Sequence, residues 1–202
     1  MKLNLLTNLN NYLNLYDKIE FSQINNEILT NFNLDQLEIT KSELENSKLT
    51  NCNFEKSYLN NVTFKNCDLT NTIFSKSFFK NVTFDNCSLV GSDFTNCSFS
   101  NIQIINSKAN NAFFDESRIS NFSLKNSSFN NSSMSNATLT NITFENSEFI
   151  YTNFSNTSLN NIDFTTCKIE GITVFPNDLK GVILTKYQAL DFVKLLGIII
   201  KE

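Results

Sequence analysis

The sequence predicts an all-β protein, a right-handed quadrilateral parallel β-helix of about 8.5 coils with a short C-terminal helix and a terminal strand. Two periodicities predict it: an apolar residue recurs every five positions, and a bulky residue recurs every twenty positions in a set that is otherwise mostly small. The composition agrees, because 20 phenylalanines imply a packed core, whereas 4 glycines and 1 proline are too few for a disordered linker.

The five-residue period defines the strands. Every fifth residue from Ile19 to Leu184 is apolar, and only Ala109 is small. The residue two positions earlier is mostly Ser, Thr or Cys, and a polar residue lies between the two. This alternation is typical of a short strand with two inward side chains. The remaining two residues of each pentad are polar and rich in Asn, which favours tight turns, so each pentad predicts one strand and one corner.

The twenty-residue period gives the number of sides. The small position becomes bulky at Val62, Val82, Ile102, Phe122, Ile142, Ile162 and Val182. Four pentads therefore form one square turn, and identical positions stack on successive turns. At a strand spacing of about 4.8 Å, the predicted tube is about 40 Å long.

The repeat divides the chain into an N-terminal cap (1–18), the β-helix (19–184) and a C-terminal capping and dimerisation module (185–202). In the first cap, three leucines have helical spacing: Leu5, Leu9 and Leu13. In the last module, Thr185 and Gln188 have the spacing of a helix capping box. We expect Gly197 to end that helix and Ile198–Ile200 to form a short strand.

Several function classes are not expected. No signal-peptide stretch and no run of about 18 apolar residues is evident, which predicts a cytoplasmic protein without membrane association. The five cysteines all occupy the small inward slot and there is no histidine, so we expect buried thiols, no metal site and no cofactor. The net charge of −4 disfavours direct nucleic-acid binding. No catalytic residue can be named, so the chain is not expected to be an enzyme.

The repeat resembles that of the pentapeptide-repeat family over some four-fifths of the chain. The tail is similar to that of the Qnr quinolone-resistance proteins, in the segments 178–183, 187–190 and 195–201. The resemblance implies a rod-shaped homodimer that binds DNA gyrase and topoisomerase IV and protects them from fluoroquinolones. Several Qnr members carry projecting loops, whereas this sequence keeps its five-residue frame and is similar to the loop-less type.

One wall of the predicted tube is the candidate partner-binding surface. It combines acidic side chains with outward apolar ones, an arrangement that suits a basic partner. Its residues are Asp35, Glu55, Ile73, Asp93, Phe113, Asp115 and Glu116. The alternative is an ordinary solvated surface. The opposite wall alternates in sign, which we interpret as charge pairing between turns; its residues are Glu45, Lys65, Asp85, Lys125 and Glu145.

The apolar residues of the C-terminal module are the candidate dimer interface, since a capped monomer would leave part of them exposed. They are Tyr187, Leu190, Phe192, Val193, Leu195, Leu196, Ile198, Ile199 and Ile200. The alternative is a cap that only closes the tube.

Rod shape suggests DNA mimicry, but duplex DNA carries roughly 24 charges over 40 Å. A net charge of −4 is far smaller. Mimicry would therefore depend on the rod shape and a local acidic surface. The leading hypothesis is a topoisomerase-binding protein that protects against quinolones, and the alternative is a structural or scaffold protein with an unrelated partner.

Overall fold

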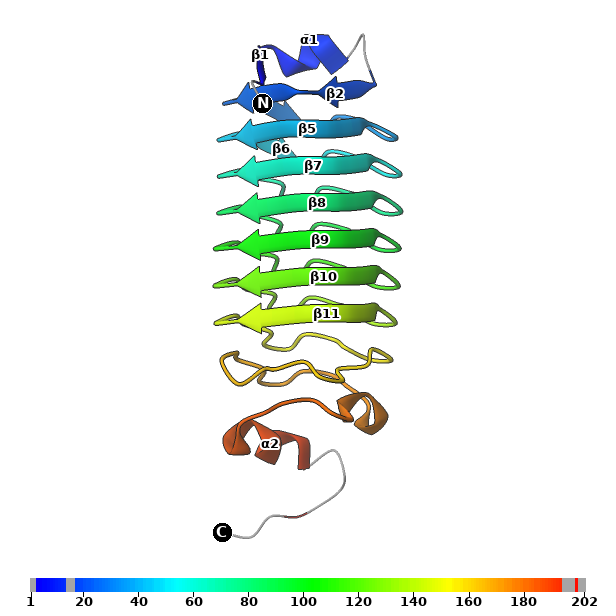
Figure 1. Cartoon of the computed structure of the whole chain (residues 1–202), viewed down its shortest axis with the longest axis vertical. Helices are drawn as coiled ribbons and strands as arrows, with labels where there is room; N and C mark the ends of the chain where they lie inside the picture. Colours follow the sequence, from blue (N-terminus) through cyan, green and yellow to red (C-terminus); the bar gives the residue numbers. More distant parts are fainter. Residues whose placement is uncertain (1–2, 14–16, 194–198, 200–202) are drawn as a thin grey trace.

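The computed structural model describes residues 3–13, 17–193 and 199. The chain winds into a rod of stacked four-sided turns, with the N-terminal and C-terminal elements at opposite ends (Figure 1). Each turn takes twenty residues and runs parallel to the next, because Tyr58 pairs with Phe78 and Phe78 pairs with Ser98. The predicted square coil of four pentads is therefore confirmed.

The main sheet bends around two adjacent walls of the rod. Its long strands are β5 (Glu38–Glu45), β7 (Tyr58–Lys65), β8 (Phe78–Asp85), β9 (Ser98–Ile105), β10 (Arg118–Lys125) and β11 (Thr138–Glu145). Shorter strands complete it at the N-terminal end: β1 (Asn4–Leu6), β2 (Lys18–Glu20) and β3 (Ser22–Asn25). A third wall carries a two-stranded sheet of β4 (Ile28–Thr30) and β6 (Lys48–Thr50).

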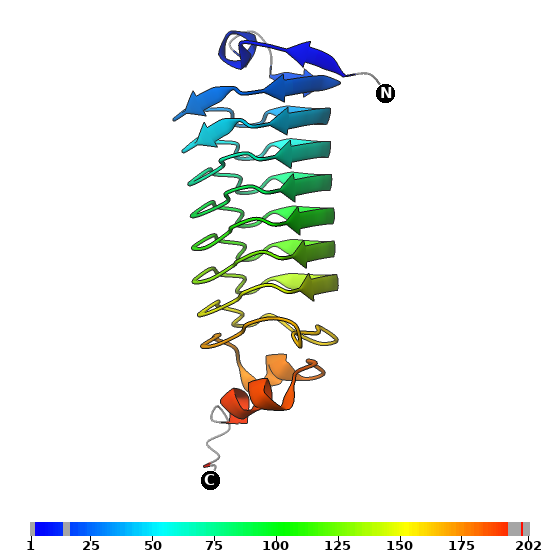
Figure 2. The ribbon, with the colours of Figure 1, turned by 90° about the vertical axis from the view of Figure 1, so that its left-hand side faces the viewer.

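We name the walls by their outward residues at twenty-residue spacing. Wall A includes positions 58, 78 and 98, wall B 63, 83 and 103, wall C 68, 88 and 108, and wall D 73, 93 and 113. The long strands cover walls A and B, whereas walls C and D stack mainly through isolated bridges. Figure 2 shows the long strands on one side of the rod and mainly irregular turns on the other, where short strands occur only near the N-terminal end. The bulky column from Val62 to Ile162 lies inside wall B, where β-branched residues favour extended backbone.

The corners owe their geometry to asparagine. From Phe21 to Asn161 every fifth residue has a positive φ, and most of these residues are Asn, which tolerates the left-handed region. Their side chains also bond from turn to turn: the amide of Asn86 donates to Asn66 (2.8 Å) and that of Asn66 to Asn46 (3.0 Å). Asparagine therefore both turns the chain and joins neighbouring coils.

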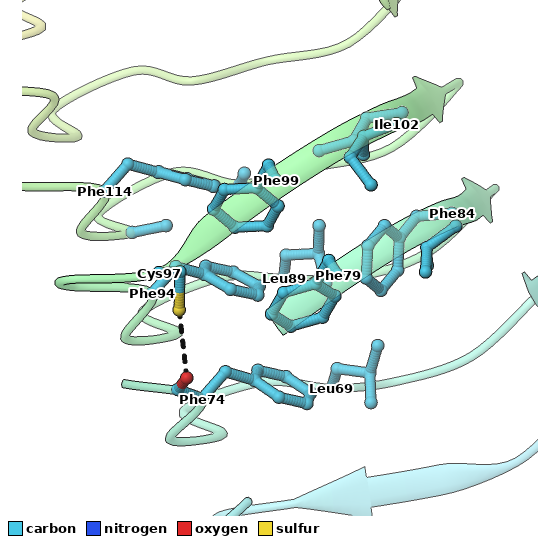
Figure 3. Close-up of a cluster of buried hydrophobic side chains, with 14 of the residues drawn as sticks. Leu69, Phe74, Phe79, Phe84, Leu89, Phe94, Cys97, Phe99, Ile102 and Phe114 are labelled. Carbon is cyan, nitrogen blue, oxygen red and sulfur yellow. Dashed lines mark hydrogen bonds between the residues drawn. The ribbon is translucent and has the colours of Figure 1, made fainter. Parts of the chain in front are cut away.

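Stacked aromatic rings fill the core. Successive ring centroids in the column Phe54, Phe74, Phe94 and Phe114 lie 5.1, 5.1 and 4.7 Å apart. All five cysteines are free and buried, as expected. The Cys97 thiol donates a hydrogen bond to the carbonyl of Phe74 one turn earlier, at 3.0 Å (Figure 3).

The N-terminal end differs from the prediction of a single helix. Helix α1 spans Leu9–Leu13, and Leu9 is buried at the mouth of the tube. Leu5 instead lies exposed in β1, so its assignment to the helix was wrong. Strand β1 pairs with the open edge of β3, and satisfying that edge favours extended backbone over a helical turn. The carboxylate of Glu27 accepts the amides of Asn8 (2.8 Å) and Leu9 (3.1 Å), which ties the cap to the first turn.

The C-terminal end carries a short 3-10 helix η1 (Pro176–Leu179) and helix α2 (Lys186–Val193). The predicted capping box is present: Thr185 N donates to Gln188 Oε1 (2.8 Å), and Gln188 N donates to Thr185 Oγ1 (3.3 Å). Gly197 and the strand expected at 198–200 fall outside the described residues, apart from Ile199, which is exposed.

The regular ladder extends over about seven turns rather than 8.5. No strand is assigned in the described chain after β11, although single bonds keep the turns stacked as far as Ile183. Within the residues that can be placed, no helix has the length and apolarity needed to cross a bilayer.

Candidate partner-binding wall

Wall D brings the predicted apolar and acidic residues together. Bridges connect Ile73 to Asp93 and Asp93 to Phe113, so these three side chains point outward on successive turns. Ile73 is 42% exposed and Phe113 is 47% exposed, so both present apolar area on the same wall. Asp93 is half-buried between them and accepts the amide of Thr95 at 2.8 Å. The centre of this wall is thus a carboxylate flanked by two apolar side chains.

The other four predicted acidic residues lie at the corner that leads from wall D to wall A. Asp35, Glu55 and Asp115 occupy its first position on different turns, and Glu116 occupies the second with a φ of 58°. Lys76 occupies the same second position two turns earlier than Glu116, and Lys56 occupies it three turns earlier. The corner therefore alternates in charge at its N-terminal half and is purely acidic at Asp115 and Glu116.

Glu55 is largely neutralised by its neighbours. Its Oε1 lies 2.8 Å from Nζ of Lys76 and 3.6 Å from Nζ of Lys56. The hydrogen bond from Lys76, followed by the charges of Lys56 and Lys76, holds the pKa of Glu55 below its usual value. Glu55 is therefore ionised but paired, and contributes less to an attractive field than its charge suggests.

Asp115 and Asp35 are also engaged within the fold. Asp115 Oδ1 accepts the amide of Ser135 (2.9 Å), the hydroxyl of Ser135 (2.5 Å) and the hydroxyl of Ser133. Asp35 accepts the amide groups of Asn33 (2.7 Å) and Gln36 (3.2 Å). Asp115 therefore joins two neighbouring turns, whereas Asp35 bonds to side chains within its own turn.

Two exposed aromatic residues next to this wall were missed in the sequence. Tyr58 and Phe78 point outward on wall A and are in register on β7 and β8; Phe78 is 58% exposed. They lie two positions after Lys56 and Lys76 in the chain, so they flank the same corner. The available signal was an aromatic residue in the outward slot between two inward positions, where polar residues are usual.

The opposite wall shows part of the expected charge pairing. Lys65 Nζ lies 3.7 Å from Glu45, and Lys125 Nζ lies 2.9 Å from Glu145. Asp85 has no ion pair in the described residues and instead accepts a long bond of 3.4 Å from the amide of Asn106. These exposed pairs stabilise the stack only slightly.

The C-terminal module presents an apolar face. Tyr187 is 71% exposed and Leu190 is exposed, whereas Phe192 and Val193 are half-buried and Phe192 packs against the core of the tube. Beside them lies a groove of about 310 Å³, lined by Pro176, Leu179, Lys180, Val182, Leu184, Ala189, Phe192 and Val193. Of the other predicted interface residues, Ile199 is exposed, and Leu195, Leu196, Ile198 and Ile200 lie outside the described residues.

Comparison with protein families gives two matches. The family described as "Pentapeptide repeat region" matches residues 37–114, and the family described as "Pentapeptide repeats (8 copies)" matches residues 123–165. Together the two matches span more than half of the chain. No curated protein matches it significantly.

Solved structures share the fold. Full-length QnrB1, a plasmid-mediated fluoroquinolone resistance protein, is 22% identical, with a TM-score of 0.54 over 88% of this chain and 100% of that chain. A trypsin-treated QnrB1 variant gives 22% identity and 0.53 over 90% and 100%. HetL, which is involved in heterocyst differentiation regulation in the cyanobacterium Nostoc, gives 13% and 0.49 over 87% and 92%. At 22% identity the similarity to QnrB1 concerns the fold.

Proposed function

Since this chain belongs to the pentapeptide-repeat family, we propose that it is a binding protein without catalytic activity, which attaches to DNA gyrase and topoisomerase IV and protects them from fluoroquinolones. The main support for this proposal is that the chain forms a rod with the fold of QnrB1 and has one wall on which apolar side chains flank a carboxylate. A rod with a local acidic surface can occupy part of a groove built for duplex DNA.

Wall D and its corner are the proposed contact surface. Five carboxylates face two lysines there, and within the described part of the chain only Glu55 among them forms an ion pair. Ile73 and Phe113 add exposed apolar area beside Asp93. Charge would steer the partner and the apolar residues would hold it, the usual division of roles at protein interfaces.

The C-terminal module is the proposed homodimer contact. Tyr187 and Leu190 on α2 are exposed beside an apolar groove, and a second copy burying this face would place the two rods end to end in a closed, two-fold arrangement. We propose a cytoplasmic location, where gyrase works.

The test is a gyrase supercoiling assay with and without ciprofloxacin. We expect the wild-type protein to restore supercoiling over some concentration range, to inhibit it at high concentration, and to lose both effects as salt is added. The variant Ile73→Ser with Phe113→Ser should lose protection at least about tenfold, because each anchor contributes on the order of 1 kcal/mol or more. Serine already occupies this column at Ser133, so the fold should tolerate both changes.

Two further variants separate the contribution of charge from that of apolar contact. Asp93→Lys with Glu116→Lys should abolish protection, because the reversed charges would repel a basic partner. Lysine already occupies the slot of Glu116 on earlier turns. The matched control is Asp85→Lys with Glu145→Lys on wall B, which should leave most of the effect. If neither the wild type nor any variant alters supercoiling or drug inhibition at micromolar concentration, the scaffold alternative replaces this proposal.

A further inference from the structure

The stack of turns is interrupted on two walls directly after β11. Among the described residues, no backbone hydrogen bond joins 138–145 to 158–165, although all earlier turns are paired on these walls. The interruption is closed at both ends: Ala137 N donates to Thr157 Oγ1 (3.0 Å) and Asn146 N donates to Thr166 Oγ1 (3.1 Å). On walls C and D the same turns remain bonded, for example from Phe149 N to Lys168 O (2.7 Å). The result is a slit across walls A and B.

The slit leaves backbone groups of β11 without partners. One turn later, the amides of Leu159, Asn161 and Phe164 donate to the carbonyls of the following turn at 2.9, 3.0 and 3.0 Å. The equivalent amides in β11 are those of Leu139, Asn141 and Phe144, and none of them has an acceptor within the residues that the structure places. In Figure 1, β11 is the last arrow of the ladder, and the turns that follow it carry no strand. Strand β11 therefore has a free edge inside the rod.

Solvent and apolar side chains both reach this edge. Leu139 and Ile142 are half-buried, whereas Ile119 and Phe122, their counterparts one turn earlier, are fully buried. A cavity of about 420 Å³ occupies the slit, and it is lined by Leu139, Thr140, Asn141, Ile142, Ser158, Asn160, Asn161 and Ile162. None of these residues is charged. The slit thus combines unpaired backbone, an apolar interior and a neutral rim.

We propose that this slit binds an extended peptide by strand addition to β11. Unpaired strand edges accept another strand through main-chain hydrogen bonds, and pockets for alternate side chains provide selectivity. Leu139, Ile142 and Ile162 would contact the apolar side chains of the incoming strand, and the neutral rim favours an uncharged segment. A charged ligand would find no opposite charge in this lining, and a flat aromatic ligand would leave the amides unsatisfied. The site is separate from wall D and does not depend on the proposed function.

Hydrogen exchange tests the proposal with its own internal control. In the free protein, the amides of Leu139, Asn141 and Phe144 should exchange at least about tenfold faster than those of Ile119, Asn121 and Leu124 in the paired strand β10. The probe is a blocked synthetic peptide that copies residues 138–144, an uncharged segment of the strand that pairs with β10. At about 1 mM it should slow the exchange of the three β11 amides at least about tenfold. A scrambled peptide of the same composition should not.

A crosslink across the slit provides the matched variant. Thr140→Cys with Asn160→Cys places two thiols on opposite lips, and a short thiol-reactive crosslinker should abolish peptide protection. Ser100→Cys with Ser120→Cys, crosslinked between the paired strands β9 and β10, should leave it unchanged. Three results would overturn the proposal. The first is β11 amides as protected in the free protein as those of β10. The second is that the peptide does not slow the exchange of the β11 amides, which would leave only water in the slit. The third is protection of the β11 amides in the free protein that disappears when the protein is diluted, because a second copy of the chain would then be covering the edge.

Discussion

At the residue scale, the space around a corner decides whether asparagine or glycine occupies it. Asparagine takes a positive φ at most corners and bonds to the asparagine of the next turn. Gly91 occurs where a Cβ atom would lie 2.3 Å from Oδ1 of Asn71. At Gly171 the ring of Tyr151 covers the position, and a Cβ atom would lie 2.5 Å from it. The glycines therefore serve close approach as well as backbone conformation.

The inward cysteines act as serine-sized core residues, and Cys97 gives a direct test. Burial raises the pKa of the Cys97 thiol from 9.0 to about 12. In the window from pH 9 to about 12, the unfolded chain has lost this proton and the native chain keeps it. The free energy of unfolding should therefore decrease with rising pH there, by up to about 1.4 kcal/mol per pH unit for this thiol.

The variant Cys97→Ser isolates that contribution. Ser117 occupies the same column and donates to the carbonyl of Phe94 at 2.8 Å, as the Cys97 thiol does to Phe74. We expect the variant to differ from the wild type by less than about 1 kcal/mol at pH 7, and to lose less stability above pH 9. Urea unfolding at a series of pH values measures both. Parallel curves for the two proteins would contradict the assigned thiol.

At the element scale, the side chain of Gln188 hydrogen-bonds helix α2 to the last turn. Gln188 Nε2 donates to the carbonyls of Phe164 and Cys167, each at 2.8 Å, while its Oε1 accepts the amide of Thr185. Gln188 therefore satisfies three backbone groups at the open end of the tube. The capping box begins the helix, and the two carbonyl bonds attach it to the solenoid.

Gln188→Ala should lower the free energy of unfolding by about 1–3 kcal/mol, because it removes the acceptor of the Thr185 amide and the bonds to the carbonyls of Phe164 and Cys167. Urea unfolding and the exchange rate of the Ala189 amide measure the effect. Lys186→Ala on the same helix removes an exposed side chain and should change stability by less than about 0.5 kcal/mol. Equal effects of the two substitutions would show that Gln188 does not hold the helix.

At the scale of the whole molecule, the exposed face of α2 decides whether the rod is single or paired. Tyr187→Ser with Leu190→Ser replaces two exposed apolar side chains without disturbing the core. We expect the wild type to have the mass of a dimer in light scattering and the variant that of a monomer, with dimer affinity reduced at least about tenfold. A dimer that survives both substitutions would move the interface elsewhere on the rod.

The sequence by itself determined the architecture. An apolar position repeated every five residues and a bulky one every twenty are sufficient to set the strand, the corner and the number of sides, because each inward slot stacks on its own copy one turn away. The phenylalanine column, the buried cysteines and the capping box at Thr185 and Gln188 follow from the same pattern. Local periodicity carries this information, and no long-range contact is needed to read it.

The tertiary structure alone decided how the outward residues are used. Charges counted along wall D suggested a free acidic surface, whereas Glu55 is paired with Lys76, and Asp115 is held by two serines. The extended backbone at Leu5 and the slit after β11 are likewise invisible in the periodicity. The physical reason is that inward positions see an almost identical environment on every turn. The pairing of outward side chains, the edge strands and the gaps between turns instead depend on the particular neighbours that the coil brings together.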